Sequence, residues 1–255
     1  MDPVLLHRAA PGSVPEVARR LRFPLGAGRG VEAVFTDRSD GDFSSCTTDA
    51  GAGPEALGQR RAAISPHPWT WLDQVHGCDV VRVTEPGSRA GARADASVTT
   101  CEAAVLSVRV ADCAPVLLFA ESDSTVVVGA AHAGWRGLAS GVLGAVVKEM
   151  STLCAGRVRW LLGPCISPRA YEFSGSDLDL LAERFGDEVR SETSSGSPAL
   201  DLRAAVRSAM EQAGCGPAEF EADECTAGSA SHWSHRGGAD RQRQVGAIWW
   251  EHDDG

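Results

Sequence analysis

The chain has 255 residues, of which 43% are hydrophobic and 23% charged, and this composition is typical of a soluble globular protein with a sizeable core. Its 24 basic residues are outnumbered by 34 acidic ones, which gives a net charge of −10 without any basic block. We therefore expect no nucleic-acid partner and no attraction to an anionic membrane.

The cysteines indicate a reducing compartment. Eight of them are scattered along the chain, with no C-x-x-C pair and no dense framework. The first 23 residues contain no continuous apolar core of the kind found in secretory signals, and no apolar stretch approaches the length that spans a bilayer. Free thiols in a cytoplasmic protein are therefore expected.

The N-terminal part of the sequence has few structural signals. Residues 1–30 are rich in Pro, Gly and Arg and are expected to form a loose segment with one short helix at 14–21. A single domain is predicted over residues 31–255, beginning with a strand at 31–36. The polar stretch 39–54 is predicted to be a long loop, and loops of that length in compact domains are usually functional or mobile.

Three short apolar runs rich in β-branched residues predict buried strands at 105–110, 115–120 and 125–131. A turn at 121–124 would join the last two as a hairpin. The other predicted elements are helices at 54–64, 138–153, 177–185 and after the cap Asp201, strands at 79–83, 158–162 and 245–250, and a polar loop at 191–197. Helices interspersed among strands favour an α+β fold, with one domain around a mixed sheet.

Reactive side chains lie at the ends of these central strands. Asp112 and Cys113 precede the second strand, and His132 follows the third. The hairpin would bring Cys113 and His132 to one edge of the sheet, where strand ends hold functional side chains firmly. Together with His76 they offer the ligands that zinc prefers, at separations that exclude a structural zinc finger but permit a catalytic site.

Other interpretations of the same residues remain open. A cysteine among apolar strands is more often an inert core residue. Alternatively, Cys113 is a nucleophilic thiolate, with His132 or His76 as its base and Asp112 as the orienting group. Arg136 and Arg236 are candidate anion holders, although a surface ion pair is the commoner role for a single arginine.

Several short motifs occur in order along the chain. They are Gln-Val-His-Gly at 74–77, Ala-Asp-Ala at 94–96, Ala-Asp-Cys-Ala-Pro-Val-Leu-Leu at 111–118, His-Ala-Gly-Trp-Arg-Gly at 132–137, Gly-Pro-Cys-Ile at 163–166, Cys-Thr at 225–226 and Ser-His-Arg at 234–236. Together they resemble the YfiH family, also called laccase-domain or peptidoglycan-editing-factor proteins. The resemblance extends from about Phe35 to Ile248, nearly the whole chain.

This resemblance implies a zinc-dependent purine nucleoside phosphorylase that also deaminates adenosine and cleaves methylthioadenosine. Its fold would be a mixed sheet folded on itself and flanked by helices, and its partners a purine nucleoside and inorganic phosphate; we expect a monomer. Carried over by position, the metal ligands and catalytic centre are His76, Cys113 and His132. The implied substrate-binding residues are Ser45, Arg61, Arg136 and Arg236.

Three segments depart from the family pattern. The usual Ser-Leu-Asn-Leu after the first strand is Ser-Cys-Thr-Thr at 45–48, and the usual Glu-Asn-Arg of the first long helix is Gln-Arg-Arg at 59–61. The usual Thr-Gly-Arg-Gln near the C-terminus is Arg-Gln-Arg-Gln at 241–244. We expect these positions to line the substrate pocket, so the metal ligands are kept while the substrate preference stays open.

Three alternative functions compete with the nucleoside enzyme. The family's older name implies a copper oxidoreductase acting on polyphenols, but multicopper sites need His-x-His pairs and the seven histidines form none. A cysteine hydrolase acting on an amide of cell-wall precursors would use Cys113 as its nucleophile. The third is a catalytically silent protein that binds a nucleoside or a cell-division partner.

Overall fold

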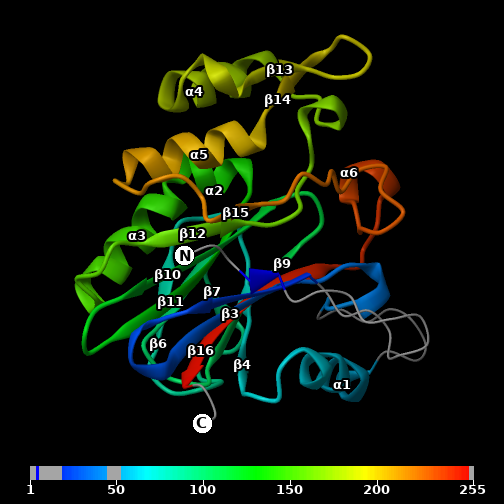
Figure 1. Ribbon diagram of the computed structural model, residues 1–255. Coiled ribbons are helices and arrows are strands. Elements are labelled where there is room, and N and C mark those ends of the chain that lie inside the picture. Colours follow the sequence, from blue (N-terminus) through cyan, green and yellow to red (C-terminus); the bar gives the residue numbers. More distant parts are fainter. Residues whose placement is uncertain (1–3, 6–18, 45–52, 253–255) are drawn as a thin grey trace.

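The computed structural model describes residues 4–5, 19–44 and 53–252, which build two six-stranded mixed sheets (Figure 1). The first sheet has the order β1 (Val4–Leu5), β2 (Arg19–Pro24), β3 (Arg29–Phe35), β16 (Gln244–His252), β9 (Val105–Val110) and β4 (Trp69–Thr70). The second has the order β15 (Phe220–Glu221), β12 (Arg159–Leu162), β10 (Ala114–Glu121), β11 (Val126–Ala133), β8 (Ala96–Thr99) and β6 (Val80–Val83).

The two sheets pack face to face around one apolar core. Phe23 of the first sheet and Phe119 of the second lie with ring centroids 5.0 Å apart in this core. On the outer face of the second sheet lie α2 (Trp135–Ser140), α3 (Val142–Leu153), α4 (Gly175–Phe185) and α5 (Leu202–Gln212). The outer face of the first sheet is covered by α1 (Pro54–Ile64). This arrangement confirms the predicted α+β class, with a mixed sheet doubled on itself and flanked by helices.

Smaller elements complete the described chain. They are the paired strands β5 (Leu72–Asp73) and β7 (Ala92–Arg93), the hairpin β13 (Arg190–Glu192) and β14 (Pro198–Leu200), the short helix α6 (His235–Gly238), and 3₁₀ turns at Gly26–Gly28, Arg38–Asp40, Pro168–Ala170 and Asp187–Val189. Residues 193–197 of the predicted polar loop 191–197 form the turn of the β13–β14 hairpin, and residues 191–192 belong to β13. Across the described ranges, no helix has the length and apolarity that a membrane crossing requires.

The central hairpin has the predicted geometry. Strands β10 and β11 are antiparallel, with Ala114 opposite Ala133 and Glu121 opposite Val126. Cys113 directly precedes β10, and His132 is the penultimate residue of β11. The register therefore places these two residues at the same edge of the sheet, as the sequence predicts.

Helix boundaries follow local chemistry. The side chain of Asp201 accepts the backbone N–H of Ala204 at 2.9 Å, which confirms the predicted cap of α5. The predicted helix 138–153 is instead two helices, because Gly141 adopts a left-handed φ of +90° that ends α2 and starts α3 in a new direction.

The prediction of a loose N-terminal segment is wrong for residues 19–30. Residues 19–24 form strand β2 instead of the end of a helix, and 29–30 begin β3. The alternation explains the strand: Leu21 and Phe23 are buried, while Arg20 and Arg22 face Glu32 as ion-pair partners. Residues 6–18 lie outside the described part of the chain.

Candidate metal centre and arginine-lined pocket

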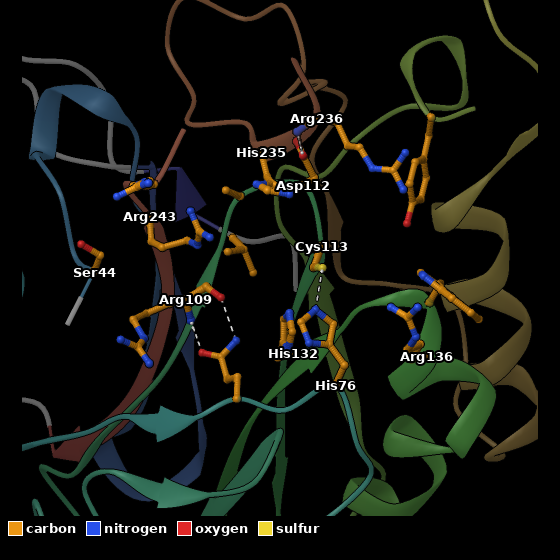
Figure 2. Close-up of a pocket in the computed structure, with 16 residues that line it drawn as sticks. Ser44, His76, Arg109, Asp112, Cys113, His132, Arg136, His235, Arg236 and Arg243 are labelled. Atoms are coloured by element: carbon orange, nitrogen blue, oxygen red, sulfur yellow. Dashed lines mark hydrogen bonds between the residues drawn. The ribbon is translucent and has the colours of Figure 1, made fainter. Parts of the chain in front are cut away.

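His76, Cys113 and His132 meet at the end of the central hairpin (Figure 2). Each offers one ligand atom, and the three atoms lie within 4.8 Å of one another. The Cys113 Sγ lies 3.9 Å from Nε2 of His76, and the two imidazole rings meet edge to face with centroids 4.7 Å apart. Residues separated by 37 and 19 positions in the sequence are thus brought into one possible three-ligand metal site.

A buried carboxylate holds two of these ligands in place. The fully buried Asp95 accepts the Nδ1–H of His132 at 2.8 Å and the backbone N–H groups of Val75, His76 and Gly77 at 3.1, 2.9 and 2.7 Å. Burial raises the pKa of Asp95, but these hydrogen bonds outweigh burial and hold that pKa below its ordinary value. Because an ionised carboxylate only accepts, His132 carries its hydrogen on Nδ1 and leaves Nε2 for a metal.

The backbone around the centre is constrained. His76 and Asp112 have positive φ values of +61° and +93°, which are uncommon for residues other than glycine. At Gly134, an added Cβ would lie 2.9 Å from Cδ2 of His76 and 3.0 Å from Sγ of Cys113. Glycine is therefore required at this position by the close approach of two ligands, although its own φ of −76° suits any residue.

The thiol and imidazole groups change each other's protonation. Burial raises the pKa of Cys113, but the positive charge and hydrogen bonding of His132 and the hydrogen bond of His76 bring it below its ordinary value. For His132, burial lowers the pKa, while the Cys113 thiolate and Asp95 raise it above its ordinary value. The centre therefore favours a thiolate, the form of cysteine that binds metals and attacks electrophiles.

A pocket of about 540 Å³ opens next to the three residues. Five arginines line it: Arg109, Arg136, Arg236, Arg241 and Arg243. Arg136 stacks over Trp135 at 4.4 Å and Arg236 over Tyr171 at 5.1 Å, measured from the guanidinium carbon to the ring centroid. Within the described residues, the guanidinium groups of Arg136, Arg236 and Arg241 have no acidic partner, so the pocket suits an anion.

Among the described residues, the one carboxylate that lines the pocket is already engaged. Asp112 accepts hydrogen bonds of 2.7 Å from the hydroxyls of Thr226 and Ser234 and from the backbone N–H of Arg236. Its side chain is buried, and its own carbonyl accepts the N–H of Ile166. Asp112 therefore has a structural hydrogen-bonding role, and it ties the loop of Arg236 to the residue that precedes Cys113.

The predicted substrate-binding residues fall into three groups. Arg136 and Arg236 line the pocket beside the three candidate ligands. Arg61 is not among the lining residues; its guanidinium packs over Trp71 at 3.8 Å, and burial together with the charge of Arg109 lowers its pKa to about 10. Ser45 lies outside the described residues, as does the departure at 46–48.

Other lining residues were not predicted from the sequence. Arg109 and Tyr171 line the pocket, and Asp95 supports it, without having been assigned a role beforehand. His235, from the Ser-His-Arg motif, also lines the pocket without having been assigned a role. Tyr171 is the single tyrosine of the sequence, which is the one feature that could have drawn attention to it. The departure at 241–244 is placed as expected, because Arg241 and Arg243 both line the pocket.

Comparisons with known proteins agree with this architecture. A family model described as multi-copper polyphenol oxidoreductase laccase matches residues 52–251. The purine nucleoside phosphorylase of Streptomyces coelicolor is 36% identical over 198 residues, which cover 76% of this chain and 79% of that protein. A purine nucleoside phosphorylase of Streptomyces griseus is 37% identical over 236 residues, covering 85% and 93% of the two chains.

Solved structures show the same fold. YlmD from Geobacillus stearothermophilus superposes with a TM-score of 0.71 at 26% identity, over 93% of this chain and 100% of that one. The hypothetical protein YfiH of Bacillus licheniformis superposes with a TM-score of 0.75 at 21% identity, over 90% and 96% of the two chains. From the match to the laccase family model, the curated relatives and the shared fold, we conclude that this chain belongs to the YfiH family of laccase-domain proteins.

Proposed function

We propose that this protein is a zinc-dependent purine nucleoside phosphorylase, which transfers the ribose of adenosine or inosine to inorganic phosphate. The observation that carries the proposal is that five arginines line the same pocket as His76, Cys113 and His132. An anionic co-substrate and a possible metal centre thus share one site. The names of the curated relatives support this choice of reaction.

Two imidazoles and one thiolate form a donor set that fits zinc. His76, Cys113 and His132 would hold the ion, with Asp95 orienting the imidazole of His132. Copper is the alternative suggested by the description of the family model, but the printed sequence contains no His-x-His pair for a multicopper cluster. When bound, zinc supplies a Lewis acid beside the substrate.

The arginines would bind and orient inorganic phosphate. In phosphorolysis a phosphate oxygen forms a bond to the ribose C1′ while the C1′–N9 bond breaks, and the purine leaves after taking a proton. Arg136 and Arg236 are the proposed phosphate holders, since their planar guanidinium groups match phosphate oxygens and are steadied by the rings beneath them. Holding the nucleophile at a fixed place supplies much of the rate acceleration in such reactions.

Tyr171 is available as a neutral hydrogen-bond donor in the same pocket. Burial raises the pKa of its phenol well above the ordinary range, so the hydroxyl keeps its proton near neutral pH. Deamination of adenosine and cleavage of methylthioadenosine, which the family resemblance implies, are included in the proposal as further activities of this pocket.

Phosphate-dependent release of base tests the proposal. Free adenine and hypoxanthine are measured from adenosine and inosine over a range of phosphate concentrations, with ammonia release as the measure of deamination. Arg136→Gln is expected to raise the KM for phosphate about tenfold or more, because one charge-assisted hydrogen bond to phosphate is lost. The matched control is Arg93→Gln, an exposed arginine outside the pocket. Base release that does not depend on phosphate would overturn the proposal.

A cysteine hydrolase is the second candidate, favoured by one geometric observation. The Cys113 thiolate lies against His76 and His132, and Asp95 orients His132 in the manner of a cysteine–histidine–aspartate triad. Such an enzyme would attack an amide carbonyl, for example in a cell-wall precursor peptide. The two candidates respond oppositely: a chelator stops the zinc enzyme and leaves the hydrolase active, while amide hydrolysis occurs only with the hydrolase.

A further inference from the structure

Two loops carry arginines into the pocket, and each is fastened by a carboxylate that accepts the backbone N–H of its arginine. Asp112 Oδ2 accepts the N–H of Arg236 at 2.7 Å, and Asp42 Oδ1 accepts the N–H of Arg243 at 2.9 Å. In the view of Figure 2, Arg243 lies to the left of Cys113 and Arg236 lies above it. The same device therefore fastens two cationic walls of the pocket, one that carries Arg236 and one that carries Arg243.

The wall that carries Arg243 is held in place by several hydrogen bonds. Asp42 also accepts the backbone N–H of Ser44 at 2.8 Å and its hydroxyl at 2.7 Å. The carbonyl of Arg243 in turn accepts the N–H of Phe43 at 2.9 Å, and the Phe43 side chain is buried. Backbone and serine donors thus occupy the Asp42 carboxylate, while the Nη1 of Arg243 donates to the carbonyls of Asp240 and Gln242.

Arg241 adds a second positive charge to this wall. Its side chain is exposed and has no acidic partner among the described residues. Arg109 lines the pocket as well, and its charge contributes to the lowered pKa of Arg61. The positive potential is therefore larger than Arg136 and Arg236 alone would produce.

We propose that Arg241 and Arg243 form a second anion subsite, which binds a phosphate monoester carried by the nucleoside, so that nucleoside 5′-monophosphates are preferred substrates of this pocket. The inference rests on the proposed function and names its substrate class. One inorganic phosphate held by Arg136 and Arg236 leaves the wall of Arg241 and Arg243 without an anion. A phosphate monoester carries close to two negative charges at neutral pH and suits paired guanidinium groups.

The shape of a nucleotide matches two separated walls. The C5′ group of a ribose is attached on the other side of the ring oxygen from C1′, so a 5′-phosphate and the phosphate that attacks C1′ are held apart. In the reaction, an oxygen of inorganic phosphate forms the bond to C1′, the C1′–N9 bond breaks, and the purine leaves with the proton that the attacking hydrogen phosphate gives up. The 5′-phosphate is unchanged, and the sugar product is ribose 1,5-bisphosphate.

Binding is measured first, because it does not require turnover. Adenosine 5′-monophosphate, adenosine and inorganic phosphate are each titrated calorimetrically into the zinc-loaded wild type, the Arg241→Thr and Arg243→Gln variants, and the control Arg93→Gln. We expect the nucleotide to bind the wild type about tenfold to hundredfold more tightly than adenosine does. The preference should shrink about tenfold in each subsite variant and persist in the control.

Three outcomes overturn the inference. They are a nucleotide that binds no tighter than adenosine, a preference that survives in both subsite variants, and a nucleotide that binds no tighter than inorganic phosphate, which would indicate a general anion site. Failure of the proposed function appears differently. In that case the nucleotide binds tightly in an Arg243-dependent way, but neither substrate releases a base when phosphate is added. The cooperative unfolding transition of each variant shows whether the fold is intact.

Discussion

Asp95 and His132 are joined twice, through their side chains and through their backbones. The carboxylate of Asp95 accepts the Nδ1–H of His132 at 2.8 Å, and the carbonyl of Asp95 accepts the His132 backbone N–H at 2.8 Å. The pairing of β8 with β11, in which Ala96 lies opposite Ala131, places the two residues side by side. The orientation of one candidate ligand is therefore fixed by the register of the sheet.

Replacing Asp95 should weaken the metal site without removing any ligand. Asp95→Asn replaces one of the two carboxylate oxygens, which together accept from His132 and residues 75–77, with an NH2 donor, so the two ligand segments lose part of their common acceptor. We expect zinc affinity to fall about 10–100-fold. Competition with a chromogenic chelator measures the affinity, and the exposed Asp73→Asn is the control. An affinity equal to that of the wild type would show that Asp95 has no part in orienting the ligands.

The close approach at Gly134 can be tested with a single methyl group. Gly134→Ala places a Cβ against His76 and Cys113, and overpacking of this kind costs about 1–3 kcal/mol, or roughly tenfold to hundredfold in zinc affinity. Gly144→Ala is the matched control, since its Cβ would meet nothing within 4 Å in the first turn of α3. The control should raise the free energy of unfolding by about 0.4–1 kcal/mol. Equal zinc affinities in the two variants would contradict this explanation.

The thiolate of Cys113 should make it far more reactive than the buried Cys165 in the metal-free protein. Alkylation rises with pH as the thiol ionises, so a lowered pKa moves the midpoint of the rate profile below the ordinary value of about 8.5. His132→Ala removes the positive partner and should shift that midpoint upward. Mass spectrometry after iodoacetamide treatment gives the rates, and Cys165, whose pKa burial raises to about 12, is the unreactive reference. A wild-type midpoint at or above 8.5 would exclude the thiolate–imidazolium pair.

Asp112 should stabilise the loop that carries Arg236. Asp112→Asn replaces one of the two carboxylate oxygens, which together accept from Thr226, Ser234 and the N–H of Arg236, with an NH2 donor, so at least one buried donor loses its partner. The free energy of unfolding in urea should fall by about 1–3 kcal/mol, and the KM for phosphate should rise. Thr226→Val removes only one of the three hydrogen bonds and should give a smaller loss. Unchanged stability with an unchanged KM would show that Asp112 does not hold this loop.

Local sequence patterns predicted the parts of the fold whose interactions are local. The runs at 105–110 and 115–120 became β9 and β10 because continuous β-branched stretches favour buried strands, and the cap at Asp201 depends on one nearby N–H. Pairing between distant segments was not visible. Strand β9 pairs with β16 of the C-terminus and not with its neighbour β10, so three consecutive strands belong to two sheets.

In the candidate site, too, contacts within a local motif were predicted and contacts between distant segments were not. The hairpin register explains why Cys113 and His132 were placed together correctly, since both belong to one local motif. Asp95 was given no role because its partners lie on other strands and loops, and no spacing rule links it to His132. The arginines at 19–22 were misread because charge masked a strand pattern in which Leu21 and Phe23 alternate inward.

The most direct test of a zinc-dependent phosphorylase measures metal content and phosphorolysis on the same samples. Wild type and Cys113→Ala are purified in parallel, zinc and copper are determined by mass spectrometry, and phosphate-dependent base release from adenosine and inosine is assayed. We predict close to one zinc per wild-type chain with measurable turnover, and the loss of both in the variant. Full turnover by a metal-free wild type in the presence of a chelator would contradict it.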